Sequence, residues 1–536
     1  MKKIKRALIS VTDKSKLASL AEILADYDCE IISTGGTKKY LQEKGFNVTG
    51  ITKETGNPEA FAGRMKTISF NIGAALLFKR DEQKDEAKRL GIKPIDLVVC
   101  NLYNFKEKKE ENVSHTELIE NIDIGGTFMI RAAAKNYKDV ATIVDPEDYE
   151  IIGEELNEND GSLSLNTRTQ LMRKVFNYTA DYDSFIATSM DEFAGKKSLR
   201  LSYRDGKELR YGENPHQKAL VYKNAEINSI IDNIEQQHGK PLSFNNLIDI
   251  NAALNTIFHF EKPACAIIKH TNACGLCSGS NMRTNLELAW AGDPISAFGS
   301  IIVFNDKVDL NTVSFFDFKN EDKSKRKFIE VIVAPKFTKK AKDYLFSKKS
   351  LRVIKYNPAL QTNDKSMRFI NGALLVQEKD NKLYKELKVV TAKKLGKHFS
   401  EQLCNFGIKA IKNVKSNAII LVRKKGEAFQ LLGMGAGQPN RVVSVKLSLE
   451  KARSNLKNEF SGDKEEFDTY FRGAMKKTLL VSDAFFPFAD NIEVAHKQGI
   501  EMFVQPGGSI RDKYVIKKCN ELGCSMIFTK MRHFKH

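Results

Sequence analysis

The chain has 536 residues, which is too long for one ordinary hydrophobic core, so two to four domains are expected. Its residues are 42% hydrophobic and 28% charged, a composition that indicates a globular protein and excludes a disordered one. No run of about eighteen apolar residues is present, and the eight cysteines are too scattered for a disulfide framework. We therefore expect a cytoplasmic protein of the reducing cytosol that does not bind a membrane.

The net charge of +18 is compatible with nucleic acid, an anionic membrane surface or small acidic substrates as partners. Much of the charge lies in lysine-rich runs that also contain acids, such as 106–111 and 321–327, and such runs are usually solvated faces. No nucleic-acid-binding motif with interleaved aromatic residues is present. Small acidic substrates are favoured, and a basic nucleic-acid-binding protein stays as an alternative that rests on charge alone.

The first elements in the chain predict a phosphate-binding edge. Arg6–Val11 and Cys29–Ile32 have the composition of strands, and the second strand leads into a glycine loop, 33–37, followed by a helix at Lys38–Lys44. This order offers backbone N–H groups and a helix N-terminus to a phosphate. The spacing fits neither a Walker A loop nor a dinucleotide fingerprint, and a tight turn is the simpler interpretation of the glycine pair alone.

Further loops strengthen that prediction. Gly63–Thr67 supplies two cations and a hydroxyl, and a strand at Ile95–Cys100 leads into Asn101–Tyr103. A turn at Asn121–Gly126 precedes a helix of small residues, and Asp139–Val144 is another strand. Strands that alternate with helices predict a doubly wound parallel sheet in which these loops meet along one edge. Several such loops together favour a phosphorylated ligand.

A domain boundary is expected near 190–207, and a dense polar segment follows at Leu209–Gln217. The apolar run Ala264–Ile268 predicts a buried strand that delivers Lys269 and His270 at its carboxyl end, where open α/β sheets bind ligands. Residues 271–275 are expected to form a loop. Without context, a solvated lysine beside a hydrogen-bonded histidine is the simpler interpretation.

Later in the chain, Lys415–Asn417 precedes another apolar run, Ala418–Val422, and this echo of the earlier unit indicates two related subdomains. The terminal segment Arg532–His536 is expected to be exposed to solvent. Cys274 and Cys277 form a CxxC motif, but the glutamate and proline of zinc deaminases are missing around it, so no catalytic metal is expected.

With these residues in view, the whole chain resembles the bifunctional AICAR transformylase/IMP cyclohydrolase family of purine biosynthesis. The resemblance rests on ordered motifs: SVTDKSKL, STGGT, GRMKT, NLYNF, NIDIGG, RAAAKN, LRYGENPHQ, IIKHTNACG, ISAFGS, KSNAI, GMGAGQPNR, SDAFFPF and MRHFKH. It implies a methylglyoxal-synthase-like cyclohydrolase domain at 1–197 and a transformylase domain at 198–536 built of two cytidine-deaminase-like α/β subdomains. It also implies a homodimer.

The resemblance implies formyl transfer from 10-formyltetrahydrofolate, as cosubstrate, to the 5-amino group of AICAR, followed by ring closure of formyl-AICAR to IMP. His270 matches the catalytic histidine, Lys269 its cationic neighbour and Asn417 the residue that orients histidine and amine. The matching AICAR-binding positions are Arg210, Tyr211, Gly299, Glu330, Phe485 and Arg532. The candidates for the folate side are Arg441, Val442, Asp490, Ser509 and Ile510.

For cyclisation, the resemblance implies proton transfer by Lys135 with Lys66, Tyr103 and Asp123 as companions. The nucleotide and phosphate contacts that it implies are Thr12, Lys14, Thr34, Gly35, Gly36, Thr37, Arg64, Thr67, Asn101 and Ile124.

The chain departs from the family pattern around the cyclohydrolase residues. The usual Leu-His-Pro and Val-His-Gly-Gly are replaced within Ile68–Ala75, NLYPF becomes NLYNF with Asn104, and Tyr137 replaces a histidine. In the transformylase, Ala273 replaces a proline. A transformylase whose first domain only binds nucleotide, with weakened cyclohydrolase activity, is therefore the alternative function.

Overall fold

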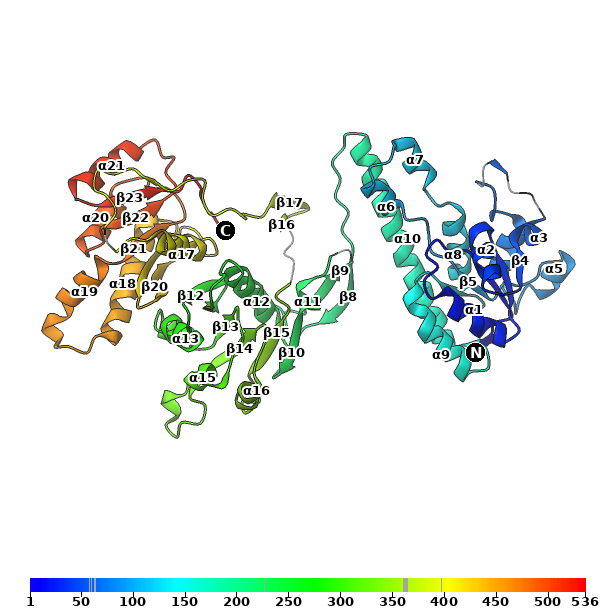
Figure 1. The fold of residues 1–536 in the computed structure, drawn as a ribbon, viewed down its shortest axis with the longest axis horizontal. Helices are drawn as coiled ribbons and strands as arrows, with labels where there is room; N and C mark the ends of the chain where they lie inside the picture. Colours follow the sequence, from blue (N-terminus) through cyan, green and yellow to red (C-terminus); the bar gives the residue numbers. More distant parts are fainter. Residues whose placement is uncertain (57, 59, 62–63, 226, 360–364, 397) are drawn as a thin grey trace. The chain divides into compact units, whose positions relative to one another are not determined.

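The computed structural model describes residues 1–536 except 57, 59, 62–63, 226, 360–364 and 397 (Figure 1). The chain divides into two compact units, Met1–Ser202 and Tyr203–His536. Within the described residues, no helix is long and apolar enough to cross a membrane.

The first unit is built on a parallel sheet with the strand order β4-β3-β2-β5-β6. Its strands are β2 (Arg6–Ile9), β3 (Glu30–Ser33), β4 (Val48–Gly50), β5 (Leu97–Val99) and β6 (Ala141–Ile143). A short antiparallel pair, β1 (Lys2–Lys3) with β7 (Ser162–Leu163), lies outside this sheet. The predicted doubly wound parallel sheet is therefore confirmed, and its strand order reverses between β2 and β5.

Alternation along the strands places helices on both faces of this sheet. Ala7 and Ile9 of β2 pack into one core with α1 and α9, whereas Leu8 packs into the other core with α4 and α8. The helices are α1 (Leu17–Asp26), α2 (Gly35–Glu43), α3 (Ile51–Thr55), α4 (Phe70–Leu77), α5 (Lys84–Arg89), α6 (Phe105–Glu110), α7 (His115–Glu120), α8 (Gly125–Lys135), α9 (Tyr149–Glu158) and α10 (Leu165–Phe193).

The second unit contains a mixed sheet that repeats one pattern twice. In each half a hairpin, β11–β12 or β19–β20, is followed by an antiparallel neighbour and then by two parallel strands. The first half contains β10 (Ile234–His238), β11 (Ala264–Lys269), β12 (Asn272–Ser278), β13 (Ser300–Phe304), β14 (Ile329–Ala334) and β15 (Arg352–Tyr356). The second half contains β18 (Lys388–Val389), β19 (Ile419–Lys425), β20 (Ala428–Gly435), β21 (Leu479–Ser482), β22 (Met502–Gln505) and β23 (Ser525–Phe528).

The two halves are joined where β12 pairs with β20, so the predicted pair of related subdomains is confirmed. One face of the shared sheet carries a continuous core under α12 and α17, and the other face carries two separate cores, one for each half. The helix α18 runs beside β20 (Figure 1). The helices are α11 (Ile230–Asn233), α12 (Phe244–Ile257), α13 (Met282–Trp290), α14 (Pro294–Ala297), α15 (Leu310–Val313), α16 (Lys339–Phe346), α17 (Glu401–Ile411), α18 (Arg441–Glu459), α19 (Phe467–Met475), α20 (Asp490–Lys497) and α21 (Asp512–Glu521).

Two antiparallel hairpins complete the second unit: β8 (Tyr203–Glu208) with β9 (Leu220–Asn224), and β16 (Lys365–Ile370) with β17 (Ala373–Glu378).

Candidate active sites

In the first unit, the predicted glycine loop is the first turn of a helix. α2 begins at Gly35 rather than near Lys38, which corrects the predicted boundary and places Gly35 and Gly36 at the helix N-terminus. Thr34 forms a hydroxyl–hydroxyl hydrogen bond with Ser10 (2.8 Å), and the hydroxyl of Thr37 both accepts from and donates to the backbone of Val11 at 3.0 Å. The unpaired N–H groups of a first helical turn attract anions, so this terminus is suited to a phosphate.

Lys66 lies against that helix terminus. A Cβ atom on Gly35 would lie 2.7 Å from the ammonium nitrogen of Lys66, so a larger residue there would displace the end of the lysine side chain. The neighbouring Thr67 is buried, and its hydroxyl lies where a Cβ on Gly125 would be. Gly63 of the same predicted loop lies outside the described residues. Two glycine-bearing segments and the Lys66–Thr67 segment therefore meet at one place.

Asn101 organises the neighbouring turn at the point where the strand order reverses. It follows β5, and its side-chain oxygen accepts from the backbone N–H groups of Thr12 (2.6 Å) and Asp13 (2.9 Å). Its amide nitrogen donates to the carbonyl of Asp13 at 3.0 Å. Lys14 folds back to the carbonyl of Thr12 at 3.2 Å. Crevices at such reversal points are the usual ligand sites of open α/β sheets.

Asp123 is a buried carboxylate at the start of α8. It accepts from the backbone N–H of Gly126 at 2.7 Å, and burial raises its pKa although backbone N–H groups of Gly126 and Tyr103 oppose that change. Burial and the neighbouring Asp123 also raise the pKa of Tyr103. Titratable groups with perturbed pKa values that lie together are candidates for proton transfer. Ile124 follows them and is exposed.

Two tyrosines of α10 brace this cluster, and the sequence had not indicated them. The hydroxyl of Tyr178 accepts from the backbone N–H of Leu102 (3.0 Å), and the hydroxyl of Tyr182 accepts from that of Asp123 (2.9 Å). Because Tyr178 and Tyr182 follow Leu102 and Asp123 by 76 and 59 residues, only the fold could reveal these contacts.

Lys135 is not brought to this cluster. α8 begins beside Asp123 and ends at Lys135, and at 1.5 Å per residue the two ends are about 15 Å apart. The chain then enters β6 at the opposite edge of the sheet, and Lys135 is exposed there. Arg64 is also exposed and pairs with Glu120. The roles of these two residues stay predictions.

The residues that depart from the family pattern have local structural roles. Ser69 caps α4 by accepting from the backbone N–H of Ile72 (3.2 Å), and Ile72 and Ala75 are buried in the core. Asn104 caps α6 in the same way by accepting from Glu107 at 3.2 Å. Both positions therefore begin helices.

In the second unit, Lys269 ends β11 and His270 begins the turn of a hairpin. His270 and Thr271 have φ values of 51° and 66°, and Asn272 already belongs to β12, so the expected loop at 271–275 is wrong. Neither residue is glycine, the usual signal for such a two-residue turn, which explains why the sequence hid it. The ammonium of Lys269 donates to the carbonyl of Phe298 at 2.8 Å.

Asp249 of α12 accepts hydrogen bonds from the backbone of this turn. Its carboxylate accepts from the backbone N–H of Thr271 at 2.7 Å and also from that of His270. Burial raises the pKa of Asp249, and these N–H groups and His270 oppose that change. The turn that carries His270 is therefore fixed at its backbone while its side chain is exposed.

One side-chain amide joins the His270 turn to the segment that carries Asn417. Asn272 donates to the carbonyl of His270 at 3.0 Å, and its oxygen accepts from the backbone N–H of Lys415 at 3.0 Å. The carboxyl end of β11 in one half thus meets the start of β19 in the other half, so the segments that carry Lys269, His270 and Asn417 lie side by side.

The same end of α12 supports the segment that carries Arg210 and Tyr211. The backbone N–H of Phe244 donates to the carbonyl of Tyr211 at 3.4 Å, and the guanidinium of Arg210 lies 5.3 Å from the centre of the Tyr211 ring. Glu330 of β14 accepts from Asn246 of α12 at 3.4 Å. Gly299 connects Phe298 to the start of β13, and its φ of 73° lies in the left-handed region that favours glycine.

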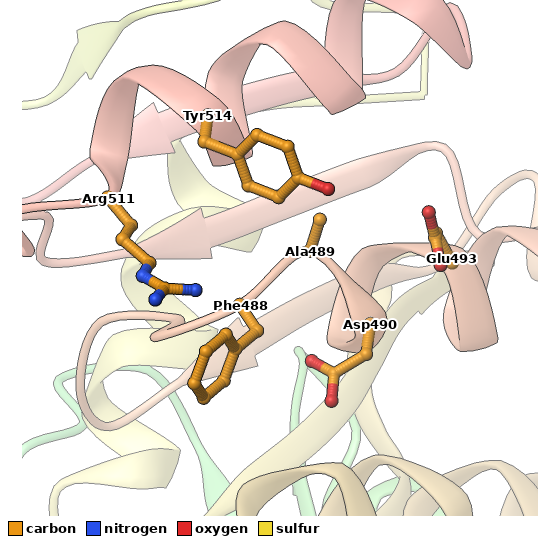
Figure 2. Close-up of a pocket in the computed structure, with 6 residues that line it drawn as sticks. All are labelled: Phe488, Ala489, Asp490, Glu493, Arg511 and Tyr514. Carbon is orange, nitrogen blue, oxygen red and sulfur yellow. The ribbon is translucent and has the colours of Figure 1, made fainter.

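The predicted folate-side residues lie in the second half. A cleft of about 600 Å³ is lined by Phe488, Ala489, Asp490, Glu493, Arg511 and Tyr514. Figure 2 shows these six residues. Ser509 and the fully exposed Ile510 directly precede Arg511, whose guanidinium lies 4.6 Å from the centre of the Phe488 ring. Val442 is half-buried at the start of α18.

Arg441 and the terminal segment are more buried than the sequence suggested. The guanidinium of Arg441 donates to Asn417 and Asp483, and only 7% of the residue is exposed, so its folate contact stays a prediction. His533 is buried and bonds to Asp380 (2.5 Å) and to the carbonyl of Leu383 (2.8 Å), which makes the expected exposed tail wrong at this residue. Arg532 beside it is exposed, and Phe485 is half-buried.

The CxxC cysteines are core residues. Cys274 and Cys277 are buried in β12, and burial raises the pKa of both thiols to about 12. Among the described residues, no group of three or more His, Cys, Asp or Glu side chains is arranged to hold a metal ion.

A sheet edge suited to a phosphate in one α/β unit, and the Lys269–His270 turn beside the Asn417 segment in the other, are the arrangement expected of an enzyme with two nucleotide sites. The family described as "AICARFT/IMPCHase bienzyme" matches residues 133–451, and an MGS-like domain matches residues 16–128. The chain belongs to the AICARFT/IMPCHase bienzyme family.

Curated relatives match over the full length. The bifunctional purine biosynthesis protein PurH of Clostridium botulinum (strain Okra / Type B1) is 44% identical over 535 residues, which cover 99% of this chain and 100% of that protein. PurH of Caldicellulosiruptor bescii is 42% identical over 546 residues, with the same coverage. The crystal structure of ForH is 30% identical over 34% of this chain and 97% of its own, with a TM-score of 0.32.

Proposed function

We propose that the chain catalyses the last two steps of IMP synthesis. A formyl group passes from 10-formyltetrahydrofolate to the 5-amino group of AICAR, and formyl-AICAR then closes its second ring with loss of water. The observation that carries the first reaction is the joining of the Lys269–His270 turn to the Asn417 segment through Asn272. Family membership over the full chain supports both reactions.

In the transfer step, the AICAR amine is a weak nucleophile because its lone pair is conjugated with the imidazole and carboxamide. Its nitrogen attacks the formyl carbon, and His270 accepts the proton that the amine loses. The bond from the formyl carbon to the folate nitrogen then breaks, and that nitrogen takes up a proton. Lys269 stabilises the oxyanion that develops between these events or supplies this proton.

The substrate and the folate approach this site from different elements. The nucleotide contacts are Arg210, Tyr211, Gly299, Glu330, Phe485 and Arg532, and the folate contacts are Val442, Asp490, Ser509 and Ile510. Arg441, predicted from the sequence on the folate side, is buried and bonded to Asn417 and Asp483. The cleft beside Asp490 (Figure 2) offers an aromatic wall and a cation at Arg511, which suits an aromatic ring that bears a carboxylate.

In the cyclisation step, the N-terminus of α2 and Lys66 bind the nucleotide phosphate, with Thr12, Lys14, Thr34, Thr37, Arg64, Thr67 and Asn101 around it. The carboxamide nitrogen attacks the formyl carbon and water leaves. Asp123 and Tyr103 exchange protons with these groups, and burial raises the pKa of both. Lys135 is the further proton-transfer candidate.

Two variants in different units test this assignment. His270→Ala should abolish formyl transfer and leave the cyclisation of supplied formyl-AICAR intact, because the two sites belong to separate compact units. Asp123→Asn should have the opposite effect. The measurement is an assay that quantifies formyl-AICAR and IMP separately. Near-normal formyl transfer by His270→Ala would refute the catalytic role of this residue.

The same assay distinguishes the bifunctional enzyme from a transformylase whose first unit has weakened cyclohydrolase activity or only binds nucleotide. Wild-type protein that forms formyl-AICAR but no IMP would support a first unit that only binds nucleotide. Lys135→Ala shows whether a residue at the far end of α8 takes part in cyclisation. We further propose a cytosolic homodimer, and sedimentation of the purified chain measures its oligomeric state.

A further inference from the structure

The side chain of Asn417 is held in one orientation by groups on both of its sides. Its oxygen accepts from Nη2 of Arg441 at 2.7 Å, and its nitrogen donates to the carbonyls of Gln438 (2.8 Å) and Pro439 (3.1 Å). A guanidinium can only donate and a carbonyl can only accept, so the reversed amide would lose all three bonds. Both N–H groups are engaged by the protein, and one lone pair of the oxygen is left for a substrate.

A buried carboxylate fixes Arg441 in turn. Asp483 is 0% exposed, and its Oδ1 pairs with Nη1 of Arg441, which also donates to the hydroxyl of Ser482 at 3.0 Å. The other oxygen of Asp483 accepts from the hydroxyl of Ser416 at 2.5 Å. One carboxylate thus holds both the arginine and the residue that precedes Asn417.

We infer that Asp483 and Arg441 are positioning residues for formyl transfer, which act through Asn417. They present the Asn417 oxygen as a hydrogen-bond acceptor in a fixed direction, so that it binds one N–H of the AICAR amine and aims the nitrogen lone pair at the formyl carbon. The inference rests on the proposed transformylase activity. Fixed orientation of reacting groups is a large part of catalysis, and small misplacements are costly.

The test compares kcat and KM for Arg441→Lys, Asn417→Ala and the double variant. Arg441→Lys should lower kcat for formyl transfer by roughly 10–100-fold and change the KM for AICAR by no more than about twofold. In the Asn417→Ala background the same substitution should have no further effect, because the residue through which it acts is already absent. Cyclisation of supplied formyl-AICAR should be unchanged in every variant.

The matched control is Arg423→Lys, which alters another buried arginine of the same unit, paired with Glu459 and Gln430. It should leave kcat for formyl transfer near the wild-type value. If circular dichroism shows that Arg441→Lys does not fold, Asp483→Asn takes its place in the comparison of single and double variants, because asparagine has nearly the same shape as aspartate.

Three results would overturn the inference. The first is a wild-type kcat for Arg441→Lys, and the second is a double variant in which the losses of kcat from the two single substitutions add. The third is an Arg441→Lys protein with an increased KM for the folate and an unchanged kcat. The last result would instead indicate a direct folate contact of Arg441. Absence of formyl transfer in the wild-type protein would overturn the proposed function as well, whereas activity with an additive cycle would overturn only the positioning role.

Discussion

Two buried arginines of the second unit, Arg423 and Arg441, each form an ion pair with one carboxylate. Arg423 and Arg441 are 8% and 7% exposed, and each is paired with a carboxylate, Glu459 or Asp483. A buried charge without a partner costs free energy of folding. Each of these carboxylates therefore contributes more to stability than a carboxylate paired at the surface would. Arg441 also contacts Asn417, whereas Arg423 lies on the strand β19 away from that residue.

Glu459 should make stability depend on pH. Burial by itself would raise its pKa, but Arg423, Lys425 and Tyr470 outweigh burial and lower it to about 2. A carboxyl with a depressed native pKa stabilises the fold above its unfolded pKa of about 4.5, and this contribution is lost as pH falls toward 2. Glu459→Gln should therefore lower the free energy of unfolding at pH 7 by on the order of 3 kcal/mol.

Urea titrations at pH 7, 4 and 3 measure this effect. The difference between wild type and Glu459→Gln should shrink as pH falls below about 4.5. The exposed Glu427, which pairs with Lys424 at 3.8 Å, provides the control, and Glu427→Gln should change stability by less than about 1 kcal/mol. A difference that is independent of pH would contradict this account.

Short helices and turns position the site residues, and their start signals are side-chain caps. Ser69 begins α4, Asn104 begins α6 just after Tyr103, and Asn440 begins α18 just before Arg441. The cap of α4 lies in the segment that departs most from the family pattern. That segment packs in the core of the first unit and contacts α8, which carries the Asp123 turn at its N-terminus.

Ser69→Ala should destabilise the first unit by about 1 kcal/mol, because the backbone N–H of Ile72 loses its acceptor. Urea unfolding followed by circular dichroism measures the change. Ser69→Thr keeps a hydroxyl at the cap and should stay within about 0.5 kcal/mol of wild type. Equal losses in the two variants would show that the cap hydrogen bond is not the cause.

At the scale of the whole molecule, each compact unit has its own hydrophobic cores. The cores of the first unit contain only residues before Ser202, and those of the second unit contain only residues after Tyr203. The single tryptophan of the sequence, Trp290, lies in a core of the second unit. Its fluorescence therefore reports the unfolding of that unit.

Leu8→Ala should lower the stability of the first unit by about 2–5 kcal/mol, since Leu8 is fully buried in β2. In urea, the circular dichroism transition should shift or split, while the Trp290 fluorescence transition should keep its midpoint. Leu286→Ala, in the same core as Trp290, should shift the fluorescence transition. Identical shifts of both signals in Leu8→Ala would mean that the two units unfold together.

The sequence by itself determined the doubly wound sheet of the first unit, the buried strand before Lys269 and the chemistry-bearing motifs, because these depend on local composition and periodicity. The fold of the second unit was implied by the family resemblance. It missed the His270–Thr271 turn, since non-glycine residues there adopt positive φ only under tertiary constraint. It also could not show that Lys135 lies at the far end of α8, which depends on how the helix runs against the sheet.

Only the tertiary structure decided which side chains hold the residues that we propose to be catalytic. Asp483 contacts Ser416 from 67 positions away in the sequence and Arg441 from 42, and Asn272 meets Lys415 from 143. Each of these residues already stood within a recognisable motif, but a motif states which residues are present and not which of them touch. Asp483 meets Ser416 and Arg441 only when β21 pairs with β19 within the second half, and Asn272 meets Lys415 only when the two halves join through β12 and β20.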